Sequence, residues 1–290
     1  MIRLSAFADE ISADLDEQIA VLTAENIRFL ELRGVWGVNV LDLSDQQVAE
    51  VKRALDAAGI GVSAIGSPIG KVPISASFDE HLHRFERALT VARAFETPFV
   101  RIFSFYAPSP TGGVGDVAGD VAGDAAADPA AWRAEVVTRL REMTARARAA
   151  AITLLHENEK DIYGDTIARC VDLMRSVDDA RFQAILDPAN SIQCGQTPYP
   201  DGYEALRPWL RYVHVKDARD DGGVVPAGVG AGRWPDLLRR LRADGYDGFL
   251  SLEPHLAHAG HAGGFSGAEL FRHAARALQE LLRAMDWEYA

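Results

Sequence analysis

Ile152-Thr153-Leu154-Leu155-His156-Glu157 is a short apolar run that ends in two side chains able to bind a metal. Three later apolar runs lead into one such side chain each, because Leu186 is followed by Asp187, Val213 by His214, and Leu252 by Glu253. A longer amphipathic stretch follows each run. Short apolar runs that alternate with stretches of helical length indicate βα units and a parallel sheet.

Outward from these four runs, the whole chain keeps the same rhythm. Apolar runs predict strands at Leu4–Phe7, Phe29–Leu32, Gly61–Ile65, Phe99–Phe103, Ile152–Leu155, Phe182–Leu186, Tyr212–Val215 and Phe249–Leu252. Amphipathic stretches predict helices at Asp14–Glu25, Ser44–Ala58, Phe78–Phe95, Pro129–Ala150, Asp165–Val177, Asp201–Trp209, Trp234–Ala243 and Ala268–Met285. Roughly eight βα units predict a (β/α)8 TIM barrel of the α/β class, formed by residues 1–290 as a single domain.

The length of 290 residues suits such a barrel, which needs about 250 residues. A doubly wound sheet is the main alternative. That fold usually carries a Gly-rich dinucleotide loop after its first strand, and none follows Phe7. The barrel is therefore the favoured fold.

The composition, with 48% hydrophobic and 25% charged residues, is that of a globular protein with a full core. No apolar run approaches the roughly 20 residues of a membrane span, and the first residues do not resemble a signal peptide, so we expect a cytoplasmic protein that binds no membrane. The net charge of −12 disfavours nucleic acid as a partner. Cys170 and Cys194 form no CxxC motif, which favours two reduced thiols.

One segment, at about residues 111–127, breaks the alternation. It is rich in Gly, Ala and Asp and contains a repeated Gly-Asp-Val-Ala. We expect a flexible surface insertion between the fourth strand and its helix. A role as a lid over the mouth of the barrel is the alternative, and simple insertion is favoured because loops lengthen at little cost in free energy.

In a barrel, functional residues lie at the carboxyl ends of the strands. Glu157, Asp187, His214 and Glu253 end four consecutive predicted strands, so we expect them to converge on one mouth. Three carboxylates would repel one another there, and a divalent cation removes that conflict. The oxygen-rich set favours Mn²⁺ or Mg²⁺, and Zn²⁺, Co²⁺ or Fe²⁺ also fit.

Each of these residues also has a purely structural interpretation. An Asp before a Pro, as in Asp187-Pro188, often forms a turn. A His between two valines, like His214, is often a hydrogen-bonded core residue, and Glu253 before Pro254 is compatible with the end of a strand. Their common position on consecutive strands favours the metal site over these alternatives.

Four segments resemble the xylose isomerase-like TIM-barrel superfamily. They are Leu155-His156-Glu157-Asn158, Leu186-Asp187-Pro188-Ala189-Asn190, Val213-His214-Val215-Lys216-Asp217 and Leu252-Glu253-Pro254-His255. This group contains sugar phosphate isomerases and epimerases, ketose 3-epimerases, inosose-converting enzymes and enzymes like AP endonuclease family 2. Two further stretches, residues 7–11 and 67–71, are similar to one subgroup of sugar phosphate isomerase/epimerase-like proteins, so the resemblance covers essentially the whole chain.

The resemblance implies a metal-dependent reaction on a small sugar, polyol ketone or sugar phosphate. It implies that Glu157 and Glu253 bind the metal and act as the acid/base pair, and that Asp187 and His214 complete the metal site. Removal of a proton α to a carbonyl passes through an enediolate, whose charge a Lewis-acid metal stabilises. The expected activity is that of an isomerase or epimerase in carbohydrate metabolism.

The chain departs from these relatives at two places. Ketose epimerases commonly have a His shortly after the Asp, where this chain has Asn190, which can hydrogen-bond a sugar hydroxyl but cannot exchange a proton. The AP-endonuclease-type enzymes bind several zinc ions through extra histidines, and residues 228–232 (Gly-Val-Gly-Ala-Gly) supply none. A dehydratase of an inosose- or dehydroshikimate-like substrate is the alternative activity, because elimination also begins with removal of an α-proton.

Other residues near strand ends are candidate substrate contacts: Glu31, Lys71, Arg101, Asn190, Lys216, Arg219 and His255. Lys216 and Arg219 would meet an oxyanion or phosphate, and the alternative is a solvated charged loop. His255, His258 and His261 suggest either a second metal site or a mobile loop, and the loop is favoured. A non-catalytic sugar-binding barrel is a further alternative, disfavoured because binding alone needs no pair of opposed bases. Related barrels often form homo-oligomers, which is possible here.

Overall fold

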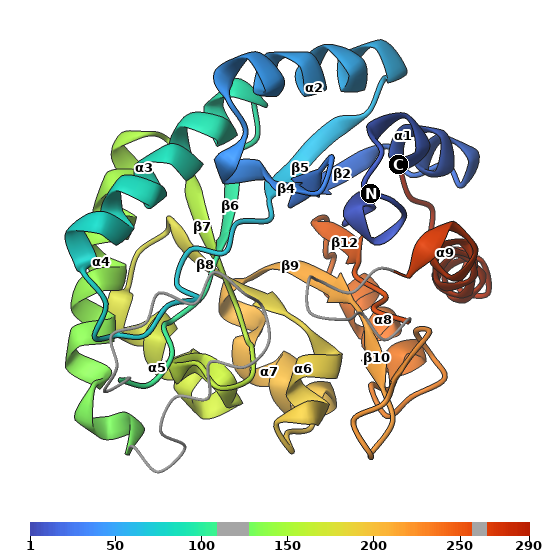
Figure 1. The fold of residues 1–290 in the computed structure, drawn as a ribbon. Helices are drawn as coiled ribbons and strands as arrows, with labels where there is room; N and C mark the ends of the chain where they lie inside the picture. Colours follow the sequence, from blue (N-terminus) through green and yellow to red (C-terminus); the bar gives the residue numbers. More distant parts are fainter. Residues whose placement is uncertain (109–127, 257–265) are drawn as a thin grey trace.

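The computed structural model describes residues 1–108, 128–256 and 266–290. Eight parallel strands close into a barrel in the order β1, β12, β9, β8, β7, β6, β5, β2, which confirms the predicted TIM barrel (Figure 1). These strands are β1 (Arg3–Ala6), β2 (Phe29–Leu32), β5 (Gly61–Ile65), β6 (Phe99–Ile102), β7 (Thr153–Glu157), β8 (Phe182–Leu186), β9 (Leu210–Val215) and β12 (Phe249–Leu252). Each agrees with a predicted strand to within two residues at either end.

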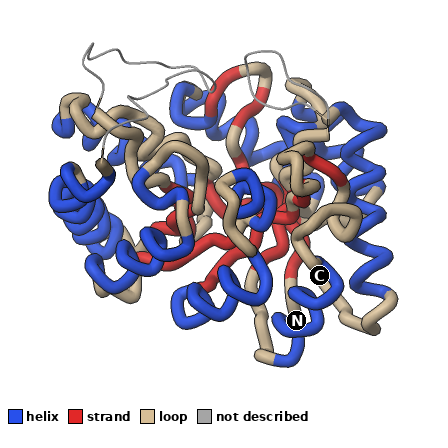
Figure 2. The backbone as a smooth tube through the Cα atoms, turned by 90° about the horizontal axis from the view of Figure 1, so that it is seen from below, coloured by secondary structure: helices blue, strands red, loops and turns tan. Residues whose placement is uncertain are grey.

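The helices surround this barrel, as Figure 2 shows from a second direction. They are α1 (Leu15–Ala24), α2 (Asp45–Ala58), α3 (Phe78–Ala94), α4 (Arg133–Ala149), α5 (Ile167–Val177), α6 (Pro188–Gln193), α7 (Tyr203–Leu206), α8 (Trp234–Ala243) and α9 (Gly267–Arg283). Helix α2 shows why the sequence marks its ends so clearly. Ser44 forms a capping box with Gln47, and Gly59 ends the helix with a φ of +67°, a conformation that glycine adopts without strain.

The structure contains short elements that the sequence did not predict. Two-stranded hairpins follow β2 and β9, formed by β3 (Gly34–Val35) with β4 (Val38–Asn39) and by β10 (Asp217–Ala218) with β11 (Val224–Val225). After β8, the single helix predicted for residues 201–209 is only the α7 turn flanked by irregular helical turns, and α6 precedes it. Prolines at 198, 200 and 208 explain the interruption, because proline donates no helical hydrogen bond.

The barrel interior changes character along its axis. Toward the amino ends of the strands it is filled by an apolar cluster of Ala64, Phe99, Leu155, Ile185, Tyr212 and Phe249. Beyond this cluster the buried inward residues are polar and charged, including Glu31, Ser251 and His214, all with no exposed surface. The barrel interior is therefore apolar around this cluster and polar toward the carboxyl ends of the strands.

The predicted insertion at about 111–127 lies outside the described residues, as do His258 and His261. Across the described ranges, no helix combines the length and the apolar character that crossing a membrane requires.

Candidate metal centre

Four buried side chains converge at the carboxyl ends of β7, β8, β9 and β12, which are neighbours in the barrel. Glu157 is the last residue of β7, Asp187 and Glu253 directly follow β8 and β12, and His214 lies near the end of β9. One donor atom from each residue lies within 4.8 Å of the others. The structure therefore brings together the four residues that the strand-end pattern selected.

His214 directs one ring nitrogen into this cluster and the other away from it. Its Nδ1 lies 2.9 Å from Glu157 Oε1, 3.8 Å from Glu253 Oε2 and 3.9 Å from Asp187 Oδ2. Its Nε2 lies 3.2 Å from Glu31 Oε2. Burial alone would lower the pKa of His214, but Glu157 and Glu31 raise it well above its usual value, so the ring is protonated when no other cation balances these carboxylates.

Asp187 combines the structural role of an Asp-Pro turn with a place in the cluster. Its Oδ1 accepts a hydrogen bond of 2.9 Å from the Asn190 backbone and so caps α6, which leaves Oδ2 to face the other donors. Asn158 fixes the backbone here, because its side chain bonds both the N–H and the C=O of Asp187. Oδ2 accepts no well-aligned hydrogen bond, and its nearest cation is Lys216 Nζ at 3.0 Å.

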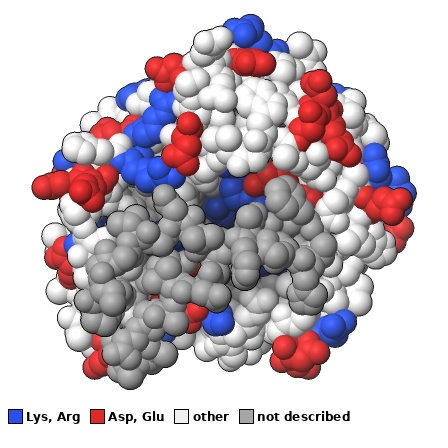
Figure 3. Space-filling model, viewed as in Figure 1, with Lys and Arg blue, Asp and Glu red and all other residues white. Residues whose placement is uncertain are grey.

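Basic side chains surround the outer oxygens of the two glutamates. Arg101 Nη1 donates to Glu157 Oε2 at 3.0 Å, and Arg33 Nη1 donates to Glu253 Oε1 at 2.8 Å. Lys216 Nζ lies 3.2 Å from Glu253 Oε2. Lys and Arg atoms are visible in a hollow near the middle of the face shown in Figure 3. The cluster is thus a set of buried carboxylates held between cations.

These cations set the protonation of the two glutamates. Burial would raise the pKa of Glu157, but His214 and Arg101 overcome it and lower the pKa to about 2. Burial would also raise the pKa of Glu253, but Lys216 and His255 hold that pKa well below its usual value. Both carboxylates are therefore ionised at neutral pH.

Asp187 carries the remaining electrostatic conflict. Its burial raises the pKa to about 6, Lys216 opposes that rise, and the charges of Glu157 and Glu253 add to it. A divalent cation among the four donors would remove this conflict, and three carboxylate oxygens with one imidazole nitrogen are a donor set that Mn²⁺, Mg²⁺ or Zn²⁺ accepts. The residues present fit a metal.

Five of the seven expected substrate contacts lie in or beside this cluster, but two of those are enclosed. Glu31 has no exposed surface and faces His214 and Ser251. Asn190 is 2% exposed and donates to Glu157 Oε1 at 3.2 Å. Both therefore contact candidate metal-binding residues, and their burial leaves little room for a direct contact with a substrate.

The remaining expected contacts differ in how close they come. His255 Nε2 lies 3.5 Å from Glu253 Oε1 and 3.1 Å from Glu10 Oε1. Lys71 lies over the Phe103 ring and pairs with Glu159 at 2.7 Å. Arg219 is not brought to the cluster. It lies in the turn between β10 and β11, 59% exposed and beside Asp221, because that hairpin, absent from the sequence prediction, carries the chain outward.

Arg33, the residue after the second predicted strand, was not among the expected substrate contacts, but the structure places it at the site. The Arg33 guanidinium contacts Asp9 at 2.7 Å and Glu10 at 3.1 Å as well as Glu253. Phe7 lies beneath both Arg33 and Arg101, with its ring 4.6 and 4.8 Å from the guanidinium carbons. The signal available in the sequence was the position of Arg33 and Phe7 at strand ends.

The Gly-rich segment after β9, which the sequence showed to lack extra metal-binding histidines, has a structural role. The buried Asp217 carboxylate accepts backbone hydrogen bonds from Gly228, Gly230 and Gly232, at 2.9 to 3.0 Å. A Cβ at Gly230 would lie 2.4 Å from the Ala218 carbonyl oxygen, so only glycine fits there. This loop anchors the chain directly after Lys216.

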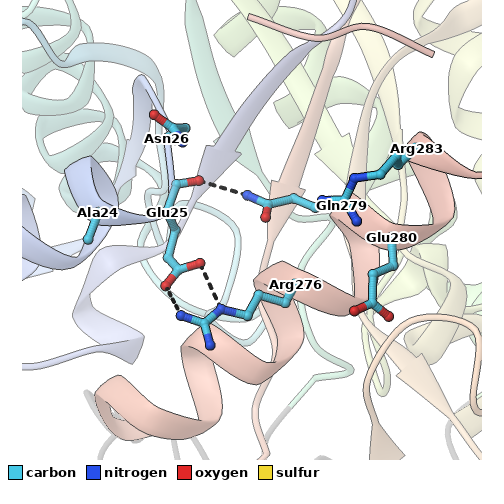
Figure 4. A pocket seen from close by; sticks show the side chains of 7 residues that line it. All are labelled: Ala24, Glu25, Asn26, Arg276, Gln279, Glu280 and Arg283. Atoms are coloured by element: carbon cyan, nitrogen blue, oxygen red, sulfur yellow. Dashed lines mark hydrogen bonds and ion pairs between the residues drawn. The ribbon is translucent and has the colours of Figure 1, made fainter. Parts of the chain in front are cut away.

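A separate cavity of about 310 Å³ lies between the end of α1 and α9. Figure 4 shows that it is bounded by Glu25, whose carboxylate pairs with Arg276 at 2.9 Å and whose carbonyl accepts from Gln279 at 2.7 Å. None of the four metal-binding candidates lines it. The contacts of Glu25 with Arg276 and Gln279 tie α9 to the end of α1, so we assign this cavity no part in the chemistry.

Solved structures of similar fold cover nearly the whole chain. D-Psicose 3-epimerase with D-tagatose from Clostridium cellulolyticum H10 is 17% identical with a TM-score of 0.75, over 97% of this chain and 99% of that chain. The probable 3-DHS dehydratase AsbF from Bacillus anthracis is 18% identical with a TM-score of 0.71, over 96% and 99%. A xylose isomerase-like TIM barrel protein from Mycobacterium smegmatis, in complex with magnesium, is 20% identical with a TM-score of 0.69, over 97% of each chain.

At these identities the structures show a shared fold. A comparison of the sequence with curated proteins finds no match. The family model described as xylose isomerase-like TIM barrel matches residues 20–285, which is most of the chain. Together with the closed barrel, this match shows that the protein belongs to the xylose isomerase-like TIM-barrel family.

Proposed function

We propose that this protein is a divalent-metal-dependent isomerase or epimerase of a sugar or sugar phosphate. The observation that carries the proposal is the convergence of Glu157, Asp187, His214 and Glu253 at one buried point of the barrel mouth. Membership of a family named for xylose isomerase supports a sugar substrate. The similar fold of D-psicose 3-epimerase supports chemistry at a carbon next to a carbonyl.

The four converging residues would hold the metal, with Mn²⁺ or Mg²⁺ favoured by the oxygen-rich donor set. The magnesium complex of the similar Mycobacterium smegmatis barrel supports an ion of this class. When bound, the ion would act as a Lewis acid that polarises the substrate carbonyl. Asp187 Oδ2 accepts no well-aligned hydrogen bond and has Lys216 as its nearest cation. His214 Nδ1 faces the carboxylates of the cluster, the nearest being Glu157. Both atoms therefore face the place where the ion would bind.

Glu157 and Glu253 would handle the proton. Both are ionised, which is the form that accepts a proton, and they come from β7 and β12, with two strands between them in the barrel. A substrate held between them would lose a proton to one ionised carboxylate. Return of that proton by the same carboxylate to the neighbouring carbon would give an isomer, and delivery from the opposite side would require the other carboxylate first to take up a proton from water. Arg101 and Arg33 orient the two carboxylates through their outer oxygens.

Lys216 and Arg101 would stabilise the negative charge that develops on the substrate oxygen. Both are 5% exposed, so water screens their charges little, and both lie within 4 Å of a glutamate of the cluster. Fixed cations in such a place lower the energy of an enediolate more than that of the neutral sugar. They are the protein's own contribution to stabilising that charge.

A dehydratase is the second candidate, favoured by one specific contact. His255 lies beside Glu253 and Glu10 and is 31% exposed on its side chain, so it can approach a substrate and protonate a departing hydroxyl. Burial would lower the pKa of His255, but Glu253 raises it to about 9, so the proton is present at neutral pH. The similar fold of a probable 3-DHS dehydratase is compatible with this reaction.

The test is a panel of ketoses, inososes, dehydroshikimate and the corresponding phosphates, incubated with Mn²⁺-loaded protein in deuterated water. We expect deuterium at the carbon next to the carbonyl of at least one compound, detected by NMR. An isomer as product identifies the isomerase or epimerase, and an unsaturated product identifies the dehydratase. Absence of exchange across the panel with Mn²⁺, Mg²⁺ and Co²⁺ would contradict both.

A further inference from the structure

A buried carboxylate that binds no metal in the proposed site lies directly behind the metal-facing histidine. Glu31 belongs to β2, and no part of it is exposed. Its Oε2 lies 3.2 Å from His214 Nε2 and accepts a hydrogen bond of 2.7 Å from Ser251. Its Oε1 lies 3.4 Å from the same ring nitrogen. Both carboxylate oxygens therefore face the side of the imidazole that points away from the cluster.

This position restricts the histidine to one arrangement. An imidazole that binds a cation through the lone pair of Nδ1 must carry its remaining proton on Nε2. An ionised carboxylate only accepts hydrogen bonds, so it favours the form with the proton on Nε2. It also limits rotation of the ring, which Phe7 and Tyr212 contact edge-on at 5.2 and 5.8 Å between centroids.

Burial of Glu31 is costly unless it is paired, because an ionised carboxylate loses several kcal/mol of hydration in a protein interior. The position paired with Glu31 on the neighbouring strand β5 is filled by Ala64, an aliphatic residue of the interior cluster that avoids this cost. A residue needed only for packing at position 31 would be apolar as well. The carboxylate at this position is therefore better explained by its contacts with His214.

We propose that Glu31 is a positioning residue, which holds His214 with its proton on Nε2 and its Nδ1 lone pair directed at the metal. The inference rests on the proposed metal site. Partners of this kind behind a metal-binding histidine raise its basicity and fix its orientation, and their loss typically weakens metal binding about 10- to 100-fold.

The first experiment compares Glu31→Leu, Glu31→Gln and Ser251→Ala with the wild type. Mn²⁺ binding to the metal-stripped proteins is measured by calorimetry, and folding without metal by thermal unfolding. We expect about 10- to 100-fold weaker binding for Glu31→Leu and a smaller loss for Glu31→Gln, whose amide oxygen still accepts a hydrogen bond. Ser251→Ala is the control, because it removes the other partner of Glu31 and leaves the carboxylate on His214.

The outcomes separate the two proposals. If the wild type does not bind Mn²⁺, the proposed metal site is wrong. If the wild type binds Mn²⁺ and both Glu31 variants bind it equally well, the site stands and the role of Glu31 is wrong. A loss of binding in Ser251→Ala as large as that in Glu31→Leu would also contradict the proposal, since it would show a general effect on packing.

A second measurement needs no variant, so it can overturn the proposal even if Glu31→Leu fails to fold. Wild-type protein labelled with ¹⁵N-histidine is loaded with Zn²⁺, a diamagnetic ion that nitrogen and oxygen sites bind more tightly than Mn²⁺. Long-range ¹H–¹⁵N spectra then report the proton of His214. We expect a protonated Nε2 and a metal-bound Nδ1, and the opposite assignment overturns the proposal.

Discussion

The first four barrel strands and the last four contribute different things to the same mouth. Strands β7, β8, β9 and β12 supply every proposed metal-binding residue. Strands β1, β2 and β6 and the turns after them supply the residues that hold those ligands, notably Arg33 and Arg101 on the glutamates and Glu31 on the histidine. The proposed metal-binding residues thus come from the second half of the chain, whereas Arg33, Arg101 and Glu31, which contact three of them, come from the first half.

The two halves contribute differently because some contacts form between neighbouring strands and others form only when the barrel closes. Within the second half, donors converge because neighbouring strands run parallel and end together. The contact between Glu253 and Arg33 depends on closure, because β1 pairs with β12 on one side and with β2 on the other. A barrel that failed to close would keep the four candidate donors adjacent but lose the contacts that Arg33 and Glu31 make with them.

The largest expected effect is on the proton-handling pair of the second half. Glu157→Gln and Glu253→Gln each remove a carboxylate that binds the metal and accepts the proton, so we expect turnover to fall about 10³- to 10⁴-fold in the exchange assay. Glu159→Gln, two residues beyond Glu157 and paired with Lys71, is the matched control and is expected to change turnover by less than about 10-fold. Near-normal turnover in either cluster variant refutes the assigned roles.

Substitution of Arg33 tests whether a contact from the first half of the chain contributes to the stability of the protein. Arg33→Met leaves Asp9, Glu10 and Glu253 without their shared cation, so we expect the free energy of unfolding to fall by about 3 kcal/mol in urea denaturation. Arg146→Met is the control, because Arg146 pairs with two glutamates on the surface and should contribute less than about 1 kcal/mol. Equal losses would show that the support from β2 is energetically unimportant.

His81 in the first half and His214 in the second are buried histidines whose pKa values shift in opposite directions. Burial lowers the pKa of His81, on α3, to about 4, whereas carboxylates raise that of His214. Because the folded protein resists protonating His81 while the unfolded chain does not, its stabilising contribution is complete above pH 6.5 and is lost as the pH falls to 4. The loss should reach about 3 kcal/mol.

The measurement is the free energy of unfolding as a function of pH. His81→Gln removes one of two buried histidines whose pKa burial lowers to about 4, the other being His156, so the profile should become less steep between pH 6.5 and 4. His83→Gln, two residues along the same helix on an exposed side chain, is expected to leave the profile unchanged. If the His81→Gln profile matches that of the wild type, His81 is not the group responsible.

Addition of Mn²⁺ tests the proposed metal site, whose four residues all come from the second half of the chain. Mn²⁺ that binds only the folded protein should raise its stability by about 2.7 kcal/mol at a concentration 100 times the dissociation constant. Thermal unfolding with Mn²⁺ and with a chelator measures this directly. Asp187→Asn is expected to lose most of the gain, and an unchanged gain in that variant would remove Asp187 from the metal site.

The smallest expected effect is at Arg219. Its exposed place in the β10–β11 turn predicts that Arg219→Gln changes kcat/KM for the best substrate of the panel by less than about twofold. Lys216→Gln, at the buried end of β9, should reduce it far more, because Lys216 lies between Asp187 and Glu253. A large loss in Arg219→Gln would instead show that the hairpin closes over the bound substrate.

Much of the fold follows from local pattern. Phe29–Leu32 and Phe249–Leu252 are bounded in the structure as the apolar runs predict. The sequence pattern did not predict short elements that form through contacts with residues elsewhere in the chain. Helix α6 exists because Asp187 caps it and Asn158, from the loop after β7, fixes its start. The β10–β11 hairpin is too short for any periodicity to reveal.

The sequence by itself determined the barrel and the four residues at the ends of consecutive strands, because both depend on spacing along the chain. Only the tertiary structure decided how these residues are held. It turned Glu31 toward the imidazole of His214, brought Arg33 across to Glu253 and carried Arg219 away. The reason is that charge pairing depends on distance in space, and these partners lie from 183 to 220 residues apart in the chain.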